Sequence, residues 1–410
     1  MKKTLRLFTL FAALAGFLAI AEEPFPAPVD SGTTFMLDAM KPIFDKGVLP
    51  GAISILYKDG KQETMLLGYA DREEKRPVTM DDLFMQASET KGFCGVTIAI
   101  LVEEGKLSLD DPVSKYLPEF KTLWVLDSEK DGIRTMHQAK TPVTIRMCLN
   151  HTAGFPFEVP VRKSNIKGGG WSGGASLRSV AAIAAACPLV FEPGTEANYC
   201  NTGFDIAAAV TEVVTGKPWE QFLKERVLDP LGMTSTTFKP TDEMLKTKMV
   251  IYAFHKQPLP TRMDFYRWQQ PPYNDAHVFP SAAAGLWTTA NDQIKFYKML
   301  MNKGVGDNGV RIMKEETFMQ CMASNTRPKD MRHDWYSLGL NASSDGWIGH
   351  GGALLNSAYV NWKTKEMKIW IIQIDESKEP WKAEREEAVK KFFDHDFDSD
   401  FQNAYTGRTE

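Results

Sequence analysis

The sequence lacks the histidine spacings that bind catalytic metal ions. Its 410 residues include seven histidines, and none of them belongs to an H-x-H pair or an H-E-x-x-H motif. Those spacings place two imidazoles on one face of a strand or helix, where both can reach the same zinc ion. Their absence argues against a metallohydrolase. We expect the protein to use no metal ion and no other cofactor.

An excess of positive charge and a regular cysteine pattern are also missing. The formal net charge is −4, which gives no electrostatic reason to expect a nucleic-acid partner. The five cysteines are Cys94, Cys148, Cys187, Cys200 and Cys321. Their odd number and wide spacing resemble neither a zinc site nor a disulfide framework. The sequence is compatible with one disulfide but does not indicate which cysteines form it, and we interpret the remaining cysteines as buried free thiols.

The one long apolar run lies at the N-terminus. Residues 7–21 are apolar, follow a short basic stretch and end in Ala19-Ile20-Ala21. This order is typical of a secretory signal peptide, and the run is short for a membrane span. We expect cleavage near Ala21 and an exported protein, periplasmic or secreted, without a stable membrane anchor. An uncleaved anchor is the alternative.

Strand patterns occur near both ends of the chain, and helix patterns occur between them. Residues 52–57 and 64–67 flank an Asp59-Gly60 turn, and residues 358–362 and 368–374 form a second strand pair. The predicted helices of the middle are 92–104, 179–186, 204–214 and 219–227. This order predicts an α+β fold. An antiparallel sheet built from both chain ends carries flanking helices and an inserted, mostly helical lobe over residues 92–284.

The chain divides into a signal peptide, an extended leader, one domain and a polar tail. Their limits are residues 1–21, 22–33, 34–395 and 396–410. The domain is expected to begin with a helix over residues 34–45 and to end with one that starts near Ala383. Residues 168–174 and 252–273 read as long loops, which often border binding sites.

Ser88-Glu89-Thr90-Lys91 places a hydroxyl and an amine three residues apart, directly before the predicted helix 92–104. Residues i and i+3 share a helix face, so the Lys91 amine can reach the Ser88 hydroxyl. A serine hydroxyl is a good nucleophile when a nearby base takes its proton. The pair is therefore a candidate catalytic unit. Because S-x-x-K also occurs by chance, a surface serine beside a solvated lysine is the alternative.

Two further segments supply groups that such a unit needs. Tyr199 and Asn201 lie two residues apart in an extended segment and point to the same side, where they could bind the Lys91 amine. The sequence His350-Gly351-Gly352 precedes a predicted strand, and its glycines let backbone N–H groups approach a substrate closely. The alternatives are a packed tyrosine with a turn asparagine, and an ordinary glycine turn with an exposed histidine.

Two other motifs are set aside. We interpret His151 as a structural, buried histidine. The sequence Gly170-Trp171-Ser172-Gly173-Gly174 matches the G-x-S-x-G pattern, which functions on a sharp strand-to-helix turn. The residues before it are polar and predict no buried strand, so Ser172 is not expected to be the nucleophile.

The motifs together resemble the penicillin-recognising serine hydrolases of the class C β-lactamase-like family, which also includes D-peptidases and esterases. The matching stretches, in order, are Pro50-Gly51-Ala52, Ala87-Ser88-Glu89-Thr90-Lys91, Asn150-His151-Thr152-Ala153-Gly154, Tyr199-Cys200-Asn201-Thr202-Gly203, Pro230-Leu231-Gly232-Met233 and His350-Gly351-Gly352. The resemblance covers nearly the whole chain after residue 21 and implies a β-lactamase/DD-peptidase-like fold.

The resemblance also implies a role for each residue. Ser88 would be acylated, with Lys91 as its base. Tyr199 would relay the proton and help to activate the deacylating water, and Asn201 would orient Lys91 and the substrate. The backbone N–H groups of Ser88 and Ala353 would form the oxyanion hole.

His350 would replace the lysine that β-lactamases of this family carry, with Gly351 and Gly352 beside the substrate. Histidine is a weaker cation than lysine for a substrate carboxylate, so the resemblance favours an esterase or D-amino-acid peptidase acting on small esters or D-amides. A cell-wall DD-carboxypeptidase or weak β-lactamase is the first alternative, and a catalytically idle peptide- or muropeptide-binding protein is the second. Glu89 would disfavour anionic substrates if it faced the site; otherwise it would face solvent.

Overall fold

The computed structural model describes residues 40–375, apart from 41–42, 59, 160–174, 255–258, 264–272, 274–277, 325 and 328–335, together with 383, 384 and 387. The predicted signal peptide, leader, loop 168–174 and polar tail lie outside the described residues, as do most of the first and last predicted helices. In the described ranges, no helix combines the length and apolarity needed to cross a membrane.

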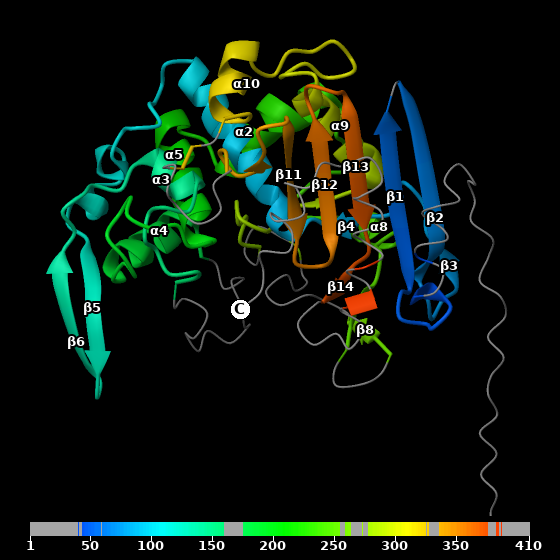
Figure 1. The fold of residues 1–410 in the computed structure, drawn as a ribbon, viewed down its shortest axis with the longest axis horizontal. Coiled ribbons are helices and arrows are strands. Elements are labelled where there is room, and N and C mark those ends of the chain that lie inside the picture. Colours follow the sequence, from blue (N-terminus) through cyan, green and yellow to red (C-terminus); the bar gives the residue numbers. More distant parts are fainter. Residues whose placement is uncertain are drawn as a thin grey trace, which may run out of the picture.

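A seven-stranded antiparallel sheet forms one side of the molecule (Figure 1). Its strand order is β10-β11-β12-β13-β1-β2-β3. The strands are β1 (Gly51–Lys58), β2 (Lys61–Asp71), β3 (Arg76–Pro77), β10 (Asn341–Ala342), β11 (Trp347–Gly352), β12 (Asn356–Asn361) and β13 (Glu366–Ile371). The two chain ends meet where β1 pairs with β13, with Ile53 opposite Ile371. The predicted α+β fold is confirmed, as is the prediction that both ends of the chain contribute strands to one sheet.

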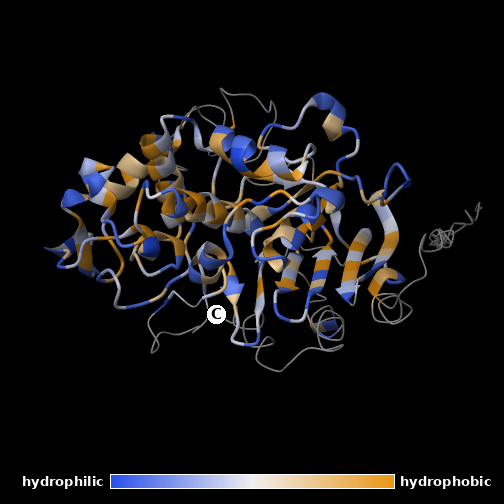
Figure 2. Ribbon diagram, turned by 90° about the horizontal axis from the view of Figure 1, so that it is seen from above, coloured by the Kyte–Doolittle hydropathy of each residue, from blue (hydrophilic) through white to orange (hydrophobic). Residues whose placement is uncertain are grey.

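Both faces of the sheet are covered, which explains the apolar character of its central strands. In β1, Ile53 and Ile55 join the main core beneath the helices, whereas Ala52 belongs to a second core on the other face. Successive side chains of a strand point to opposite faces, so β1 must be apolar on both. Hydrophobic and hydrophilic residues alternate along other strands of the sheet (Figure 2).

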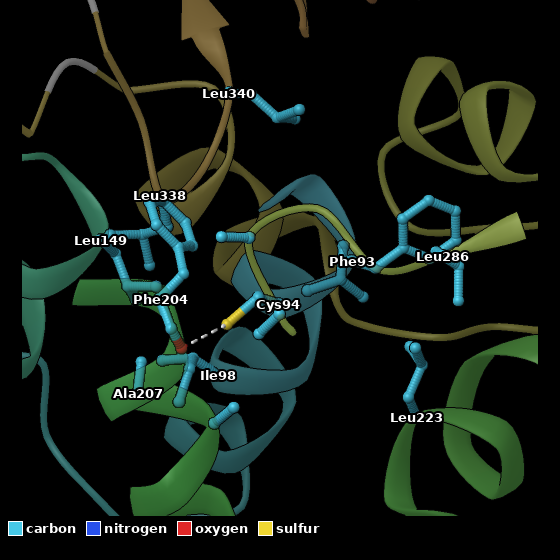
Figure 3. Close-up of a cluster of buried hydrophobic side chains, with 14 of the residues drawn as sticks. Phe93, Cys94, Ile98, Leu149, Phe204, Ala207, Leu223, Leu286, Leu338 and Leu340 are labelled. Carbon is cyan, nitrogen blue, oxygen red and sulfur yellow. Dashed lines mark hydrogen bonds between the residues drawn. The ribbon is translucent and has the colours of Figure 1, made fainter. Parts of the chain in front are cut away.

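The central helix α2 (Thr90–Glu103) packs against the sheet at β11 and against the helical lobe at α5 (Thr202–Thr215). It is buried from Thr90 to Leu101, as expected for a helix that is apolar on all sides. Figure 3 shows Phe93, Cys94 and Ile98 of α2 among the surrounding core side chains. A side chain at Gly95 would meet the Leu338 carbonyl oxygen at 1.8 Å, so only glycine permits this approach.

The remaining elements surround α2 and the sheet. The helices are α3 (Ile145–Leu149), α4 (Leu177–Ala186), α6 (Trp219–Leu223), α7 (Asp229–Leu231), α8 (Asp242–Leu245), α9 (Ala290–Met301) and α10 (Glu315–Cys321), with a π-helical stretch at Lys224–Leu228. Short 3₁₀ helices are η1 (Ala87–Glu89), η2 (Val113–Lys115) and η3 (Pro118–Lys121). The minor strands are β4 (Phe84–Met85), β5 (Trp124–Lys130), β6 (Ile133–Gln138), β7 (Ile251–Ala253), β8 (Thr261–Met263), β9 (Trp287–Thr288) and β14 (Ile374–Asp375).

The structure differs from the sequence predictions in two segments. Residues 252–273 are not one long loop, because β7 pairs with β8 and also with β14. The β5–β6 hairpin lies inside the lobe predicted to be mostly helical, and extends away from the sheet (Figure 1). Most of its side chains are exposed, so burial imposes no clear alternation on the sequence.

All five cysteines lie in the described ranges, and none is bonded to another. Cys94, Cys148, Cys200 and Cys321 are buried, whereas Cys187 is partly exposed. The interpretation as buried free thiols therefore holds for four of them, and the structure contains no disulfide among the five.

Candidate active site

Ser88 lies in the 3₁₀ turn η1, immediately before α2. The turn begins at Ala87, whose φ of +49° is in the left-handed region that residues with a side chain rarely adopt. Thr90 fixes the turn by donating to the Ala87 carbonyl at 2.7 Å and accepting the Leu286 N–H at 3.2 Å. The strained backbone is thus held by tertiary contacts, as at many functional sites.

Lys91 reaches Ser88 as the i,i+3 spacing predicts. Its side chain is fully buried, and its Nζ lies 3.3 Å from the Ser88 Oγ. The same nitrogen lies 2.8 Å from the Asn201 Oδ1 and 3.0 Å from the Ala283 carbonyl oxygen. The alternative of a solvated lysine is therefore wrong.

These three partners suit both protonation states of the amine. An ammonium group donates one hydrogen to each of them. A neutral amine donates to the Asn201 and Ala283 oxygens and keeps its lone pair for the Ser88 hydroxyl hydrogen. The geometry therefore allows Lys91 to take the Ser88 proton without moving its side chain.

Tyr199 and Asn201 meet Lys91 from the segment that leads into α5. The Lys91 Nζ lies 4.6 Å from the centre of the Tyr199 ring, and Asn201 supplies the hydrogen bond described above. The predicted same-side arrangement is therefore present. Asn201 also donates through its Nδ2 to the Glu158 Oε1 at 3.4 Å, which helps to orient its amide.

His151 contacts the Tyr199 segment through a hydrogen bond and through its ring. Its Nδ1 accepts the Cys200 N–H at 3.1 Å, and its ring centre lies 4.5 Å from that of Tyr199. Burial, together with the charges of Arg327 and Lys91, lowers the pKa of His151 well below its usual value, so the ring is neutral. This agrees with a structural histidine, although the sequence did not reveal the Cys200 partner.

His350 lies in β11 and is buried, with 3% of its surface exposed, so the alternative of an exposed histidine is wrong. Its Nδ1 lies 2.6 Å from the Gly351 carbonyl oxygen, which can only accept a hydrogen. Its Nε2 lies 3.2 Å from the Tyr336 Oη, and burial raises the pKa of Tyr336 well above its usual value. We assign a hydrogen to Nδ1, which faces this carbonyl oxygen, whereas the phenol can pair with Nε2 either as donor or as acceptor.

The end of β11 packs directly on the nucleophile turn. A side chain at Gly352 would meet the Gln86 carbonyl oxygen at 2.5 Å and the Ala87 Cβ at 3.5 Å. Gly352 therefore allows β11 to approach η1 closely. Ala353, the second predicted oxyanion-hole residue, follows this contact directly in the sequence.

Glu89 takes neither of the orientations expected from the sequence. It is fully buried, and its Oε2 accepts a hydrogen bond from the Gln293 Nε2 of α9 at 2.7 Å. Burial raises its pKa well above the ordinary value of 4.5, against the effect of that hydrogen bond. Both predicted orientations, towards the substrate and towards solvent, are therefore wrong. Gln293 of α9 contacts the buried Glu89 carboxyl group instead.

We expect Glu89→Gln to fold normally and Glu89→Ala to lose about 2–4 kcal/mol of stability, because alanine leaves a cavity and an unpaired Gln293 donor. The free energy of unfolding from urea titrations measures the loss.

The raised pKa of Glu89 also makes the stability of the protein depend on pH. The stability that wild type draws from protonated Glu89 is complete below about pH 4.5 and declines as the pH rises towards the folded-state pKa. In urea unfolding, the free energy of unfolding of Glu89→Gln minus that of wild type should therefore increase from pH 5 to pH 9. A constant difference would indicate a carboxylate that is ionised in the folded state.

Sequence reasoning missed three parts of this site. They are the left-handed Ala87, the Ala283 carbonyl and the buried Asp205 of α5, whose Oδ1 accepts the Ala282 N–H at 2.9 Å. Alanine gives no signal of a positive φ, and backbone acceptors have no side-chain signature. Asp205 was visible only as an acid in an otherwise apolar helix pattern.

Comparison with known proteins places the chain among similar sequences and folds. The family model described as Beta-lactamase matches residues 36–369. Protein Rv1367c of Mycobacterium tuberculosis is 28% identical over 321 residues, which cover 77% of this chain and 76% of that protein.

Two solved structures share the fold. EstCE1, described as a hydrolase with promiscuous acyltransferase activity, has a TM-score of 0.66 at 22% identity, covering 87% of this chain and 97% of that one. The D-amino acid amidase of Ochrobactrum anthropi SV3 has a TM-score of 0.64 at 22% identity, covering 91% and 99%.

Proposed function

The chain belongs to the beta-lactamase family of serine hydrolases, and from this membership we propose that it hydrolyses small neutral esters or D-amino-acid amides through an acyl-enzyme on Ser88. The proposal includes export of the chain, which rests on the signal-peptide pattern of residues 1–21. The partner is a small-molecule substrate.

Acylation follows from the contacts of Ser88. The neutral Lys91 amine takes the hydroxyl proton while the Ser88 Oγ attacks the substrate carbonyl carbon, and the carbonyl electron pair moves onto the oxygen. The backbone N–H groups of Ser88 and Ala353 stabilise that oxyanion. The tetrahedral intermediate then collapses, and Tyr199 passes the proton from Lys91 to the departing alcohol or amine.

Deacylation reverses these transfers with water in place of the leaving group. A water molecule gives one proton to the Tyr199–Lys91 pair and attacks the ester carbon of the acyl-enzyme. The intermediate expels the Ser88 Oγ, which regains its proton from Lys91. Asn201 keeps the Lys91 amine in place throughout, because its Oδ1 remains a hydrogen-bond acceptor for either protonation state.

The buried position of His350 is the observation that carries the choice of substrate. Both of its ring nitrogens have hydrogen-bond partners, and Nδ1 faces an oxygen that fixes the hydrogen there. Protonation of Nε2 would let it donate to the Tyr336 oxygen, but it would also bury a positive charge, which is costly. A substrate carboxylate would therefore find no fixed cation at this position, which favours uncharged esters and amides over penicillins and cephalosporins.

A substrate panel tests the proposal. We expect p-nitrophenyl butyrate or a D-phenylalanine amide to be hydrolysed with a kcat/KM about 10- to 150-fold above that for a chromogenic cephalosporin, since loss of a charge-assisted contact costs about 1.5–3 kcal/mol. Labelling with a fluorescent penicillin, competed by a D-Ala-D-Ala peptide, would instead support the cell-wall peptidase. A wild-type protein that is acylated by neither an ester nor a fluorophosphonate would support the idle binding protein.

A further inference from the structure

Asp205 is a fully buried carboxyl group in the first turn of α5. Its Oδ1 accepts the Ser281 hydroxyl hydrogen at 3.0 Å and the Ala282 N–H at 2.9 Å. The Ser281 Oγ in turn accepts the Ala283 N–H at 3.3 Å. Asp205 thus organises the whole turn over residues 281–283.

This turn carries one of the three partners of Lys91. The Ala283 carbonyl oxygen lies 3.0 Å from the Lys91 Nζ. Asp205, Ser281 and Ala283 therefore form a chain of hydrogen bonds that begins at a buried acid and ends at the proposed base. The proposed mechanism gives Asp205 no role, so its burial calls for another explanation.

The charge of Asp205 is also coupled to that of Lys91. Burial raises the pKa of Asp205 to about 7, whereas Ser281, the Ala282 N–H and the Lys91 charge act to lower it. The Lys91 charge therefore favours the ionised form of Asp205.

Two buried thiols also interact with the charge of Asp205. They are Cys94 of α2 and Cys200, which precedes α5. Burial raises the pKa of each thiol, so both are neutral. Lys91 is a positively charged group that acts on Asp205.

We propose that Asp205 is a positioning residue that holds the Ala283 carbonyl against Lys91 and, through its negative charge, favours the ammonium form of Lys91 over the free amine. The inference deepens the proposed function and rests on it. An ionised Asp205 stabilises the ammonium form, so Lys91 must lose its proton against that attraction before it can accept the Ser88 proton. Removal of the charge makes the free amine available at a lower pH.

The test is the pH profile of Asp205→Asn. Asparagine keeps an oxygen for the Ser281 hydroxyl and the Ala282 N–H but carries no charge. We expect the acidic limb of kcat/KM for p-nitrophenyl butyrate to move to lower pH by about 1 unit, as removal of a nearby opposite charge predicts. Glu212→Gln is the matched control, because Glu212 is another acid of α5 that accepts the Trp219 N–H rather than organising residues 281–283. Its limb should coincide with that of wild type.

A second variant keeps the carboxyl group and covers the case in which Asp205→Asn does not fold. Ser281→Ala removes one hydrogen bond to the Asp205 anion and so destabilises it, which weakens its attraction for the Lys91 ammonium group and should move the limb in the same direction by less. If the variants fold and their kcat/KM profiles keep the wild-type pH midpoint but reach a lower maximum, this inference is overturned and the proposed function is not. A wild-type enzyme that reacts with neither ester nor fluorophosphonate would overturn the proposed function, and this inference with it.

Discussion

Replacement of Ser88 by alanine is expected to abolish ester hydrolysis, with kcat falling by about 10⁴-fold or more. The Ser88 Oγ is the atom that becomes acylated, and alanine removes it without adding bulk. The Lys91 Nζ keeps its bonds to the Asn201 and Ala283 oxygens, so the surrounding structure should be retained. Initial rates with p-nitrophenyl butyrate measure the loss, and thermal unfolding within a few degrees of wild type shows that the variant is folded.

Ser172→Ala is the matched control for this variant. Ser172 belongs to the G-x-S-x-G match and lies outside the described residues. We expect this variant to keep most of the wild-type activity, since the proposed chemistry does not involve Ser172. Loss of activity in Ser172→Ala with retention in Ser88→Ala would reverse the assignment of the nucleophile.

Lys91→Met should lower the rate of Ser88 acylation by about 10³- to 10⁴-fold, because the hydroxyl loses its base. Methionine is unbranched and of similar length, so it fits the fully buried site. It leaves the Asn201 Oδ1 and the Ala283 carbonyl oxygen without this donor, at a cost of about 1–3 kcal/mol for each group that stays unpaired. Single-turnover acylation by a fluorophosphonate separates this chemical loss from the loss of stability, which chemical denaturation measures.

Lys115→Met provides the comparison for a general loss of positive charge. Lys115 is half-exposed and pairs with Asp111 at 2.9 Å on the surface, where an ion pair contributes little. This variant should be acylated at the wild-type rate. An acylation rate for Lys91→Met within tenfold of wild type would show that another group activates Ser88.

The sequence predicted those features that depend on short patterns. Alternation and turn residues indicated the strands on both sides of Asp59-Gly60, and the i,i+3 spacing placed Lys91 at Ser88. The same-side geometry of Tyr199 and Asn201 also followed from local backbone, and the Lys91–Asn201 bond then joined residues 110 positions apart. Local spacing was enough to predict these contacts because the backbone geometry of a helix turn or an extended segment fixes which side chains lie on the same side.

Contacts between distant segments decided the remainder. Glu89 is buried because α9 covers it through Gln293, 204 positions later, and no local pattern indicates that contact. Asp205 depends in the same way on the turn at Ser281. The left-handed Ala87 is imposed by its tertiary surroundings against the preference of alanine. His350 was expected only to precede a strand, whereas it lies within β11 and pairs with Tyr336, 14 positions earlier.

Identification of the acylated residue tests the central claim most directly. Wild-type protein should be incubated with a fluorophosphonate, followed by intact-mass measurement and peptide mapping. We predict one adduct per chain on the peptide that contains Ser88, no adduct in Ser88→Ala and slow formation in Lys91→Met. An adduct on Ser172, or a folded wild-type protein that forms none, would contradict the assignment of Ser88 as the nucleophile.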